Sequence, residues 1–454
     1  MFVLPEDVKN ILKTLNNAGH SAYVVGGCVR DCLMGKIPVD WDITTSAEPH
    51  EVKAAFQHTV DTGIEHGTVT VVIDQKNYEV TTFRIDGTYK DARRPEAVEF
   101  TTDLEMDLAR RDFTMNAIAY NPAMSDSTAS SSISSGFTNS NSGLVDPFGG
   151  VEDICRKNIR CVGDPSLRFD EDALRMMRAI RFSAQLSFEI DKPTYNAIHP
   201  LAEKLALISM ERIREELTKI LVSPNPGALQ HLSETGLWKH ILRGHSYEGD
   251  LSCGDWLKKC PKDPAMLYGL LMHKPACESS ESMVSGSMAS GSMASWYESF
   301  MRHLKFDNRT IKEAAIYASY LDADNVNIKN ERIDIKNERM NMKNERYNIK
   351  KTLNAIGSEL FENLLILHEI TRPQKSSHYK SIHSTYKDII KSGECFCIKN
   401  LAVNGQDLIN AGIAPGETMG KIMDDLLDKV MADPSLNQKE LLLKLILYNE
   451  IDLI

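Results

Sequence analysis

The sequence predicts an α+β protein, with a mixed sheet that carries helices in its first 150 residues and only helices after it. Short β-branched runs such as residues 68–73 alternate with helical patterns in this first part. A turn-rich stretch, Asp146-Pro-Phe-Gly-Gly-Val-Glu-Asp153, then ends the alternation, and the apolar patterns beyond it have helical spacing. These observations predict an N-terminal sheet domain followed by all-helical domains.

The composition is typical of a globular protein in a reducing compartment. Of 454 residues, 42% are hydrophobic and 25% are charged. No apolar run approaches the roughly 18–20 residues of a membrane span, and the first residues lack a signal-peptide pattern. The nine cysteines are scattered without metal-binding spacing, so we expect free thiols. We therefore expect a cytoplasmic protein with no membrane partner and no stable protein partner.

The charge distribution leaves a nucleic-acid partner open. The formal net charge of −11 argues against such a partner for the protein as a whole. Between Arg156 and Arg181, however, seven Lys and Arg face four Asp and Glu. RNA binding needs only a local basic track, so this reversal of sign permits it.

The central stretch of the sequence is Tyr23-Val-Val-Gly-Gly-Cys-Val-Arg-Asp31. Residues 23–25 form a predicted buried strand, and Gly26-Gly27 open a turn into a predicted helix. Glycines let backbone N–H groups approach a ligand closely, and a helix N-terminus favours a phosphate. A lone Gly-Gly pair is more often only a turn, so phosphate binding requires further chemical groups close by in the sequence.

Two aspartates supply such groups, Asp40 and Asp42, separated by a single residue. On a strand, alternate residues point to the same face, so both carboxylates are predicted to project together. Such a pair of hard oxygen ligands suits Mg²⁺. Glu79, on a later predicted strand, could join them. A phosphate-binding turn beside a metal-binding pair is what metal-assisted nucleotidyl transfer requires.

The elements of the first domain follow in order from spacing and turn residues. A two-strand hairpin is predicted where residues 68–73 and 78–83 flank a polar turn. Residues 85–100 have no clean periodicity and predict a mobile loop. Residues 107–120 have helical spacing and carry a polar cluster that includes Arg111, Asp112 and Asn116. The remaining predicted elements are a helix over 5–17, a strand around 40–43 and a helix over 50–56.

A helix over 169–188 is the second chemically important element. Leu174, Met177, Ile180 and Ala184 form its predicted core stripe, and Arg175, Arg178 and Arg181 form a basic row. Glu171 and Asp172 precede Arg175 by one turn, close enough to pair with it. An ordinary salt bridge on a helix surface is the plainer interpretation of these residues.

Three low-complexity stretches interrupt the pattern. Residues 122–143 and 276–296 are rich in Ser and Gly and predict disordered insertions. Residues 323–351 carry a seven-residue repeat with Lys-Asn-Glu-Arg in each copy. Its apolar positions lack the spacing of a coiled-coil seam, so a charged, solvated extension is predicted.

Four motifs together resemble class II tRNA nucleotidyltransferases of the polymerase-beta-like superfamily. They are, in order, Val25-Gly-Gly-Cys-Val-Arg-Asp31 with Asp40-Trp-Asp42, Arg110-Arg-Asp-Phe-Thr-Met-Asn116, Asp146-Pro-Phe-Gly-Gly150 and Glu171-Asp-Ala-Leu-Arg175. The resemblance covers about residues 5–270 and resumes near Leu401. It implies a nucleotidyltransferase head (1–150), a neck for nucleobase recognition (151–224), a body (225–322) and, after the repeat insertion, a tRNA-binding tail (352–454).

The resemblance implies addition of CCA to the 3′ end of tRNA from CTP and ATP. Asp40 and Asp42 would hold two Mg²⁺ ions, with Glu79 as a further catalytic residue. The nucleotide-binding residues would be Gly26, Gly27 and Arg30 at the triphosphate, Arg111 and Asp112 at the ribose, together with Asn116, Asp172, Arg175 and Arg178. The protein would contact the acceptor stem and the elbow of the tRNA.

Asp172 and Arg175 also account for base selection through hydrogen-bond polarity. Cytosine and adenine each present an amino donor beside a ring-nitrogen acceptor, which a carboxylate and a guanidinium complement. Uracil and guanine present the reverse pattern and would be mismatched. The pair could therefore select C and A without a nucleic-acid template.

Several relatives of this family remain as alternatives. A poly(A) polymerase is disfavoured because its basic signature near 63–67 is absent, whereas an enzyme that adds only A stays open. CC-adding relatives lack a flexible loop that residues 86–99 supply here, so this segment argues against a CC-adding enzyme. His273 is not followed by an aspartate, so no metal-dependent phosphohydrolase activity is expected. A non-catalytic RNA-binding relative and a transferase acting on a small molecule are the alternatives from other classes.

Overall fold

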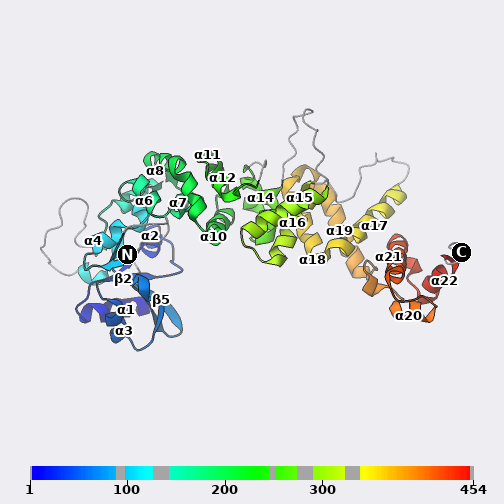
Figure 1. Ribbon diagram of the computed structural model, residues 1–454, viewed down its shortest axis with the longest axis horizontal. Helices are drawn as coiled ribbons and strands as arrows, with labels where there is room; N and C mark the ends of the chain where they lie inside the picture. Colours follow the sequence, from blue (N-terminus) through cyan, green and yellow to red (C-terminus); the bar gives the residue numbers. More distant parts are fainter. Residues whose placement is uncertain are drawn as a thin grey trace. The chain divides into compact units, whose positions relative to one another are not determined.

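The chain forms two compact units, residues 1–247 and 248–454. The computed structural model describes residues 3–87, 98–125, 143–245, 251–273, 290–322 and 338–449. The main sheet belongs to the first unit, and within the described residues the second unit consists of helices (Figure 1). The predicted α+β class is therefore confirmed, whereas the finer division into head, neck, body and tail stays a prediction.

A seven-stranded mixed sheet forms the core of the first unit, with strand order β3-β4-β5-β2-β1-β8-β9. β2 and β5 run parallel, and the other neighbouring pairs run antiparallel. The strands are β1 (Ala22–Val25), β2 (Asp42–Thr45), β3 (Thr59–Gly63), β4 (Thr68–Ile73), β5 (Lys76–Thr82), β8 (Ala119–Tyr120) and β9 (Leu144–Val145).

Local patterns predict the elements at the N-terminus well. In α1 (Glu6–Asn17), the apolar residues at helical spacing are buried. The hairpin of β4 and β5 closes through Asp74 and Gln75, whose φ angles are +46° and +62°. Two left-handed residues make a tight two-residue turn, so the second strand starts at Lys76 instead of 78. Two short helices, α2 (Gly27–Leu33) and α3 (Pro49–Ala55), complete this region.

Two predictions for residues 85–120 are wrong in part. The ends of the predicted loop form a ribbon, because β6 (Arg84–Asp86) pairs with β7 (Val98–Phe100); residues 88–97 lie outside the described residues. The predicted helix over 107–120 is instead α4 (Leu104–Ala109), a single 3-10 turn η2 (Thr114–Asn116) and β8. Backbone pairing of Ala119 with Val25, and a bridge from Phe113 to Cys161, outweigh the local helical spacing.

The predicted helix over 169–188 is divided in two. α6 (Pro165–Glu171) ends where Asp172 takes an extended conformation, and α7 (Leu174–Leu186) begins after it. The Asp172 carboxylate accepts a hydrogen bond of 3.0 Å from the backbone N–H of Leu174, the first residue of the new helix. The predicted core stripe of α7 is confirmed, since all four of its residues are buried.

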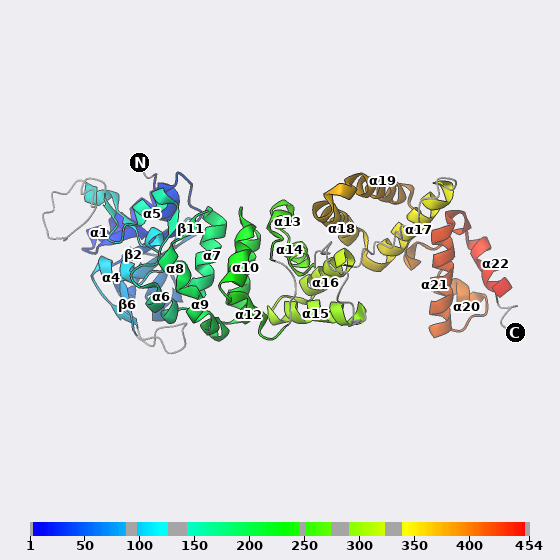
Figure 2. The ribbon, with the colours of Figure 1, turned by 90° about the horizontal axis from the view of Figure 1, so that it is seen from above.

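Helices form most of the rest of the first unit, and α7 and α10 run side by side (Figure 2). A two-stranded parallel ribbon within this region departs from the all-helical prediction. The elements are α5 (Gly150–Arg156), β10 (Asn158–Ile159), β11 (Glu189–Ile190), α8 (Lys192–Asn196), α9 (Ile198–Leu201), η4 (Ala202–Leu207), α10 (Met210–Leu221), η5 (Pro226–Leu229), α11 (Gln230–Glu234) and α12 (Leu237–Leu242).

The second unit is built from α13 to α22. The predicted insertion boundary at 351 falls inside α17, where Ile349 and Lys350 are buried and Lys350 pairs with Glu394 at 2.9 Å. The predicted insertion over 276–296 likewise ends inside α15; residues 126–142, 276–289 and 323–337 lie outside the described residues. The helices are α13 (Gly254–Lys259), α14 (Pro264–Met272), α15 (Ser290–His303), α16 (Asn308–Asp322), α17 (Glu338–Ile356), α18 (Ser358–Thr371), α19 (Ser376–Ser392), α20 (Gly405–Asn410), α21 (Glu417–Ala432) and α22 (Lys439–Asn449).

An ion pair between a buried carboxylate and a half-buried arginine joins the sheet domain to α7. The Arg178 guanidinium donates to the Asp112 carboxylate at 2.6–2.7 Å. The same carboxylate accepts from the Phe113 backbone N–H at 2.8 Å and from Asn116 at 3.2 Å. Burial alone would raise the pKa of Asp112, but the charge and hydrogen bonds of Arg178 outweigh it and lower the pKa to about 2.

A close backbone contact fixes α5 against η2. Gly150 starts this helix, and its N–H donates to Asp146 at 2.7 Å. A β-carbon on Gly150 would lie 2.2 Å from the carbonyl oxygen of Thr114. The Asp146-Pro-Phe-Gly-Gly150 motif therefore has a packing role, because only glycine allows this approach.

We expect Gly150→Ala to destabilise the first unit by about 2–3 kcal/mol, because the methyl group overlaps a backbone atom that cannot move alone. Urea denaturation followed by circular dichroism measures the change. Gly420→Ala is the control, since a β-carbon there has no neighbour within 4 Å. An unchanged midpoint for Gly150→Ala would show that α5 shifts freely.

We expect Asp112→Asn to cost about 2–3 kcal/mol at neutral pH, because the buried Asp112 carboxylate loses its charge and the half-buried Arg178 loses its charged partner. The pKa of Asp112 is about 2 when folded and about 3.9 when unfolded. Its contribution is therefore complete above about pH 4 and disappears as the pH falls through 2. Unfolding free energies measured between pH 7 and pH 2 should converge for the two proteins, and a constant difference would contradict this expectation.

Candidate functional site

The predicted phosphate turn lies at the end of β1. Gly26 is buried and has a φ of +81°, between β1 and the first residue of α2. A β-carbon on Gly26 would lie 3.1 Å from Nη1 of Arg111. The glycine therefore allows the backbone to turn and brings this guanidinium directly against the turn.

The predicted acidic residues lie at the neighbouring edge of the sheet. Asp42 is the first residue of β2, and its register partner on the parallel strand β5 is Glu79. Asp40 is in the bend before β2, so the prediction that both aspartates belong to the strand is wrong for Asp40. All three residues are exposed to solvent. The strand register thus places Glu79 beside Asp42. This is the position that Glu79 needs if it is to join the two aspartates as a third acidic group.

The electrostatics of Asp42 fit a cation site. Loss of water on the protein side raises the pKa of Asp42, the charge of Arg111 opposes this shift, and the charge of Asp40 adds to it. A cation between the two carboxylates would relieve their repulsion. Within the described residues, no three His, Cys, Asp or Glu side chains converge as a ready ligand set. Mg²⁺ commonly uses one or two carboxylates together with water and substrate phosphates, so the pair suffices.

A fully buried carboxylate, Asp107, holds the two arginines of the second motif. Arg110 donates to it at 2.6 and 3.1 Å, and Arg111 donates at 3.2 Å. Burial would raise the pKa of Asp107, but the charges of Arg111 and Arg110 lower it below its ordinary value. The interaction fixes the Arg111 guanidinium between Asp107 and the Gly26 turn.

Arginines from two helices gather around Phe182. Their guanidinium carbons lie 5.3 Å (Arg30), 5.4 Å (Arg178) and 4.1 Å (Arg181) from the ring centroid. Arg30 also donates to the Asn116 side chain at 2.8 Å. These contacts bring the predicted residues Arg30, Asn116 and Arg178 into one basic cluster.

The predicted base-selecting residues adjoin this cluster. Arg175 donates to Glu171 at 2.6 Å and to the backbone carbonyl of Arg110 at 2.8 Å. The predicted pairing of Glu171 with Arg175 is confirmed, although the two residues lie on different helices. Asp172 accepts from Arg212 of α10 at 3.0 Å. The bond to Arg110 connects Arg175 to the motif that carries Arg111.

Three contributors were missed by sequence reasoning. Asp107 precedes Arg110 and Arg111 by three and four residues, so helical spacing gave a usable signal. Arg168 pairs with Glu171 at 2.6 Å and Arg212 pairs with Asp172. The Arg212 contact joins two separate helices, and no local pattern could have indicated it.

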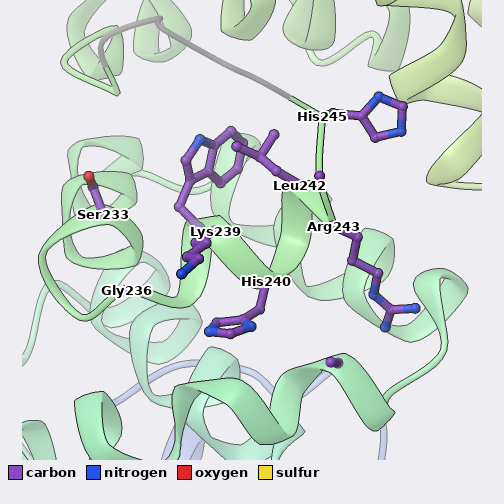
Figure 3. A pocket seen from close by; sticks show the side chains of 10 residues that line it. Ser233, Gly236, Lys239, His240, Leu242, Arg243 and His245 are labelled. Atoms are coloured by element: carbon purple, nitrogen blue, oxygen red, sulfur yellow. The ribbon is translucent and has the colours of Figure 1, made fainter.

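A separate hollow of about 620 Å³ lies around α12 at the end of the first unit. Figure 3 shows Lys239, His240 and Arg243 extending from this helix and the residue after it. Arg243 donates to the backbone carbonyl of Ile208. Burial and the neighbouring Lys239 charge lower the pKa of His240, so the positive charge here comes from Lys239 and Arg243.

No helix in the described part of the chain is long and apolar enough to cross a membrane.

Three sequence families match successive parts of the chain. Residues 22–160 match the poly A polymerase head domain. Residues 187–248 match a probable RNA- and SrmB-binding site of polymerase A, and residues 287–446 match a family described as tRNA nucleotidyltransferase domain 2, putative. Each of the three therefore covers a different portion of the chain.

Individual relatives extend this similarity over the whole chain. The chain is 33% identical to the CCA-adding enzyme of Levilactobacillus brevis over 440 residues, 96% of each protein. It is 47% identical to that of Geobacillus thermodenitrificans over 250 residues, 55% of this chain and 56% of the relative. The crystal structure of the Bacillus stearothermophilus CCA-adding enzyme in complex with CTP superimposes with a TM-score of 0.73 at 30% identity, covering 99% of both chains. The chain belongs to the family of CCA-adding enzymes, a family of divalent-metal-dependent nucleotidyltransferases.

Proposed function

We propose that this protein adds C, C and A in turn to the 3′ end of tRNA, using CTP and ATP and no nucleic-acid template. Two observations support this most directly: the charge of Arg111 acts on Asp42, and the backbone carbonyl of the preceding residue, Arg110, accepts a hydrogen bond from Arg175. Together they connect groups suited to a triphosphate with groups suited to a base. The names of the relatives point to the same activity. The cytoplasm is the compartment where this activity would be used.

Asp40 and Asp42 are the proposed metal ligands, with Glu79 beside them, and Mg²⁺ is the proposed ion. When bound, the divalent ions lower the pKa of the attacking hydroxyl and neutralise charge on the leaving pyrophosphate. The primer 3′-oxygen forms a bond to the α-phosphorus, the bond from this phosphorus to the bridging oxygen breaks, and pyrophosphate leaves. Gly26, Gly27, Arg30 and Arg111 would hold the triphosphate in line for this exchange.

The base would lie against Asp172 and Arg175. Glu171 and the Arg110 carbonyl hold Arg175 in one orientation, and Arg212 and the Leu174 N–H hold Asp172. Fixed donors and acceptors select by hydrogen-bond polarity because an opposed pattern in a dry site cannot relax. Asp112, Asn116 and Arg178 would shape the ribose side of the same pocket.

The helical regions provide surfaces for the remainder of the tRNA. The hollow around Lys239 and Arg243 falls within the segment that matches an RNA-binding family. We propose that phosphates of the acceptor stem pass over it, and that the tail contacts the elbow. Addition of A alone is the second candidate, since the same pocket accepts ATP. The match of residues 287–446 to a tRNA nucleotidyltransferase domain disfavours poly(A) synthesis.

The decisive assay supplies tRNA lacking its CCA end, Mg²⁺ and each labelled nucleotide singly and together. We expect C, C and A to be added in that order, and Asp42→Asn to lower kcat by about a thousandfold or more through loss of a metal ligand. Asp74→Asn at the exposed hairpin turn is the control and should retain activity. Incorporation of A alone identifies an A-adding enzyme, and no incorporation with bound tRNA identifies a non-catalytic relative.

Reversing the polarity of the base-selecting pair tests its role. We expect the double variant Asp172→Arg, Arg175→Asp to prefer UTP and GTP over CTP and ATP, although its overall rate falls because the contact with Glu171 is lost. The ratio of kcat/KM values among the four nucleotides is the measurement. Glu215→Arg, an exposed charge reversal on α10, should leave this ratio unchanged. An unaltered preference in the double variant would place base selection elsewhere.

A further inference from the structure

The loop between α2 and β2 exposes two aliphatic side chains directly beside the catalytic aspartates. Ile37 is 94% exposed and Val39 is 92% exposed, more than any other large hydrophobic residue in the described ranges. The start of the loop is fixed, since the Lys36 N–H donates to the Asp31 carbonyl at 2.8 Å. Exposed aliphatic residues are ordinary on a protein surface, so it is the position of these two beside the proposed metal ligands that points to a ligand.

Chain geometry limits what these side chains can contact. Val39 is adjacent to Asp40, and Ile37 is three residues before it. Consecutive Cα atoms are about 3.8 Å apart, so both residues lie within about 11 Å of Asp40 along the backbone. Pro38 restricts Ile37 to extended conformations and stiffens the segment between them. Any molecule that brings a hydroxyl to the aspartates therefore passes close to this pair.

The primer terminus is the substrate that must occupy this position. The incoming nucleotide is accounted for by Gly26, Arg111 and the base-selecting pair, none of which belongs to this loop. The ribose and base of the last RNA nucleotide carry apolar faces, and its phosphate is anionic. Lys36 is exposed and precedes Ile37 directly, so the loop offers a cation for that phosphate beside an apolar surface for the base.

We propose that Ile37 and Val39 form a platform on which the 3′-terminal nucleotide of the RNA primer packs, with Lys36 facing its phosphate. This inference depends on the proposed function. An apolar platform suits a primer whose last base changes in each round, because every base has an apolar face and no hydrogen-bond pattern is read. Two side chains are far too small an area for a stable protein interface, which disfavours a protein occupant.

The test uses the full-length variant Ile37→Ser, Val39→Ser with tRNA lacking its CCA end. We expect kcat/KM for tRNA to fall roughly tenfold, mainly through a higher KM for tRNA, while CTP affinity by equilibrium dialysis stays unchanged. The conservative variant Ile37→Leu, Val39→Ile should retain wild-type values. Val3→Ser with Val60→Ser, at aliphatic residues 84% and 52% exposed elsewhere on the first unit, is the matched control.

A primer without its terminal base separates packing from a structural role. On this abasic primer, the kcat/KM values of the wild type and of Ile37→Ser, Val39→Ser should differ by less than about twofold. The primer then has no base to pack on the two side chains, so their removal has no further effect. The proposal is overturned if Ile37→Ser, Val39→Ser has the same KM and kcat for tRNA as the wild type. It is also overturned if the variant loses affinity for CTP to the same extent as for tRNA. Failure of the wild-type protein to extend tRNA would instead overturn the proposed function.

Discussion

Two buried carboxylates, Asp107 and Asp112, hold the arginines of the candidate site from opposite sides of one short segment. Asp107 faces the sheet and fixes Arg110 and Arg111. Asp112 faces the neighbouring helix and fixes Arg178. A buried charge without a partner costs several kcal/mol, so each carboxylate strongly restricts where its arginines can lie. The two carboxylates thereby fix Arg110, Arg111 and Arg178, three arginines of the candidate site.

This arrangement also explains how an acidic protein can present a site for anions. The formal net charge is −11, yet Arg30, Arg178 and Arg181 lie around a single aromatic ring. Their mutual repulsion is visible in Arg181, whose pKa is lowered to about 10 by burial and by the neighbouring Arg178 charge. Each of these arginines also pairs with a carboxylate, Asp31, Asp112 or Glu216, which offsets part of the repulsion. Under the proposed function, a bound triphosphate would offset it further.

Local patterns predicted those parts of the fold that local forces determine. The turn at Gly26, the β4–β5 hairpin and the core stripe of α7 follow from glycine, from turn residues and from periodicity. The structure of residues 107–120 was not predicted by local patterns, because their backbone pairs with β1 and with Cys161, which are distant in the sequence. The break at Asp172 was also missed; its carboxylate is held both locally, by the Leu174 N–H, and by Arg212 of another helix. The candidate site residues were predicted from motifs, whereas their interaction partners required the structure.

The failures of local prediction coincide with the chemically important segments, and this has a physical cause. In such segments, bonds to residues distant in the sequence compete with the local hydrogen bonds of a regular helix. In residues 109–116 the backbone carbonyl of Arg110 is used to hold Arg175, and that of Ala109 accepts from Arg168. Arg175, the proposed base-selecting arginine, is thus held by the backbone of the segment that carries Arg111. Under the proposed function, selection of the base and positioning of the triphosphate would be coupled, because a shift in this segment displaces both side chains.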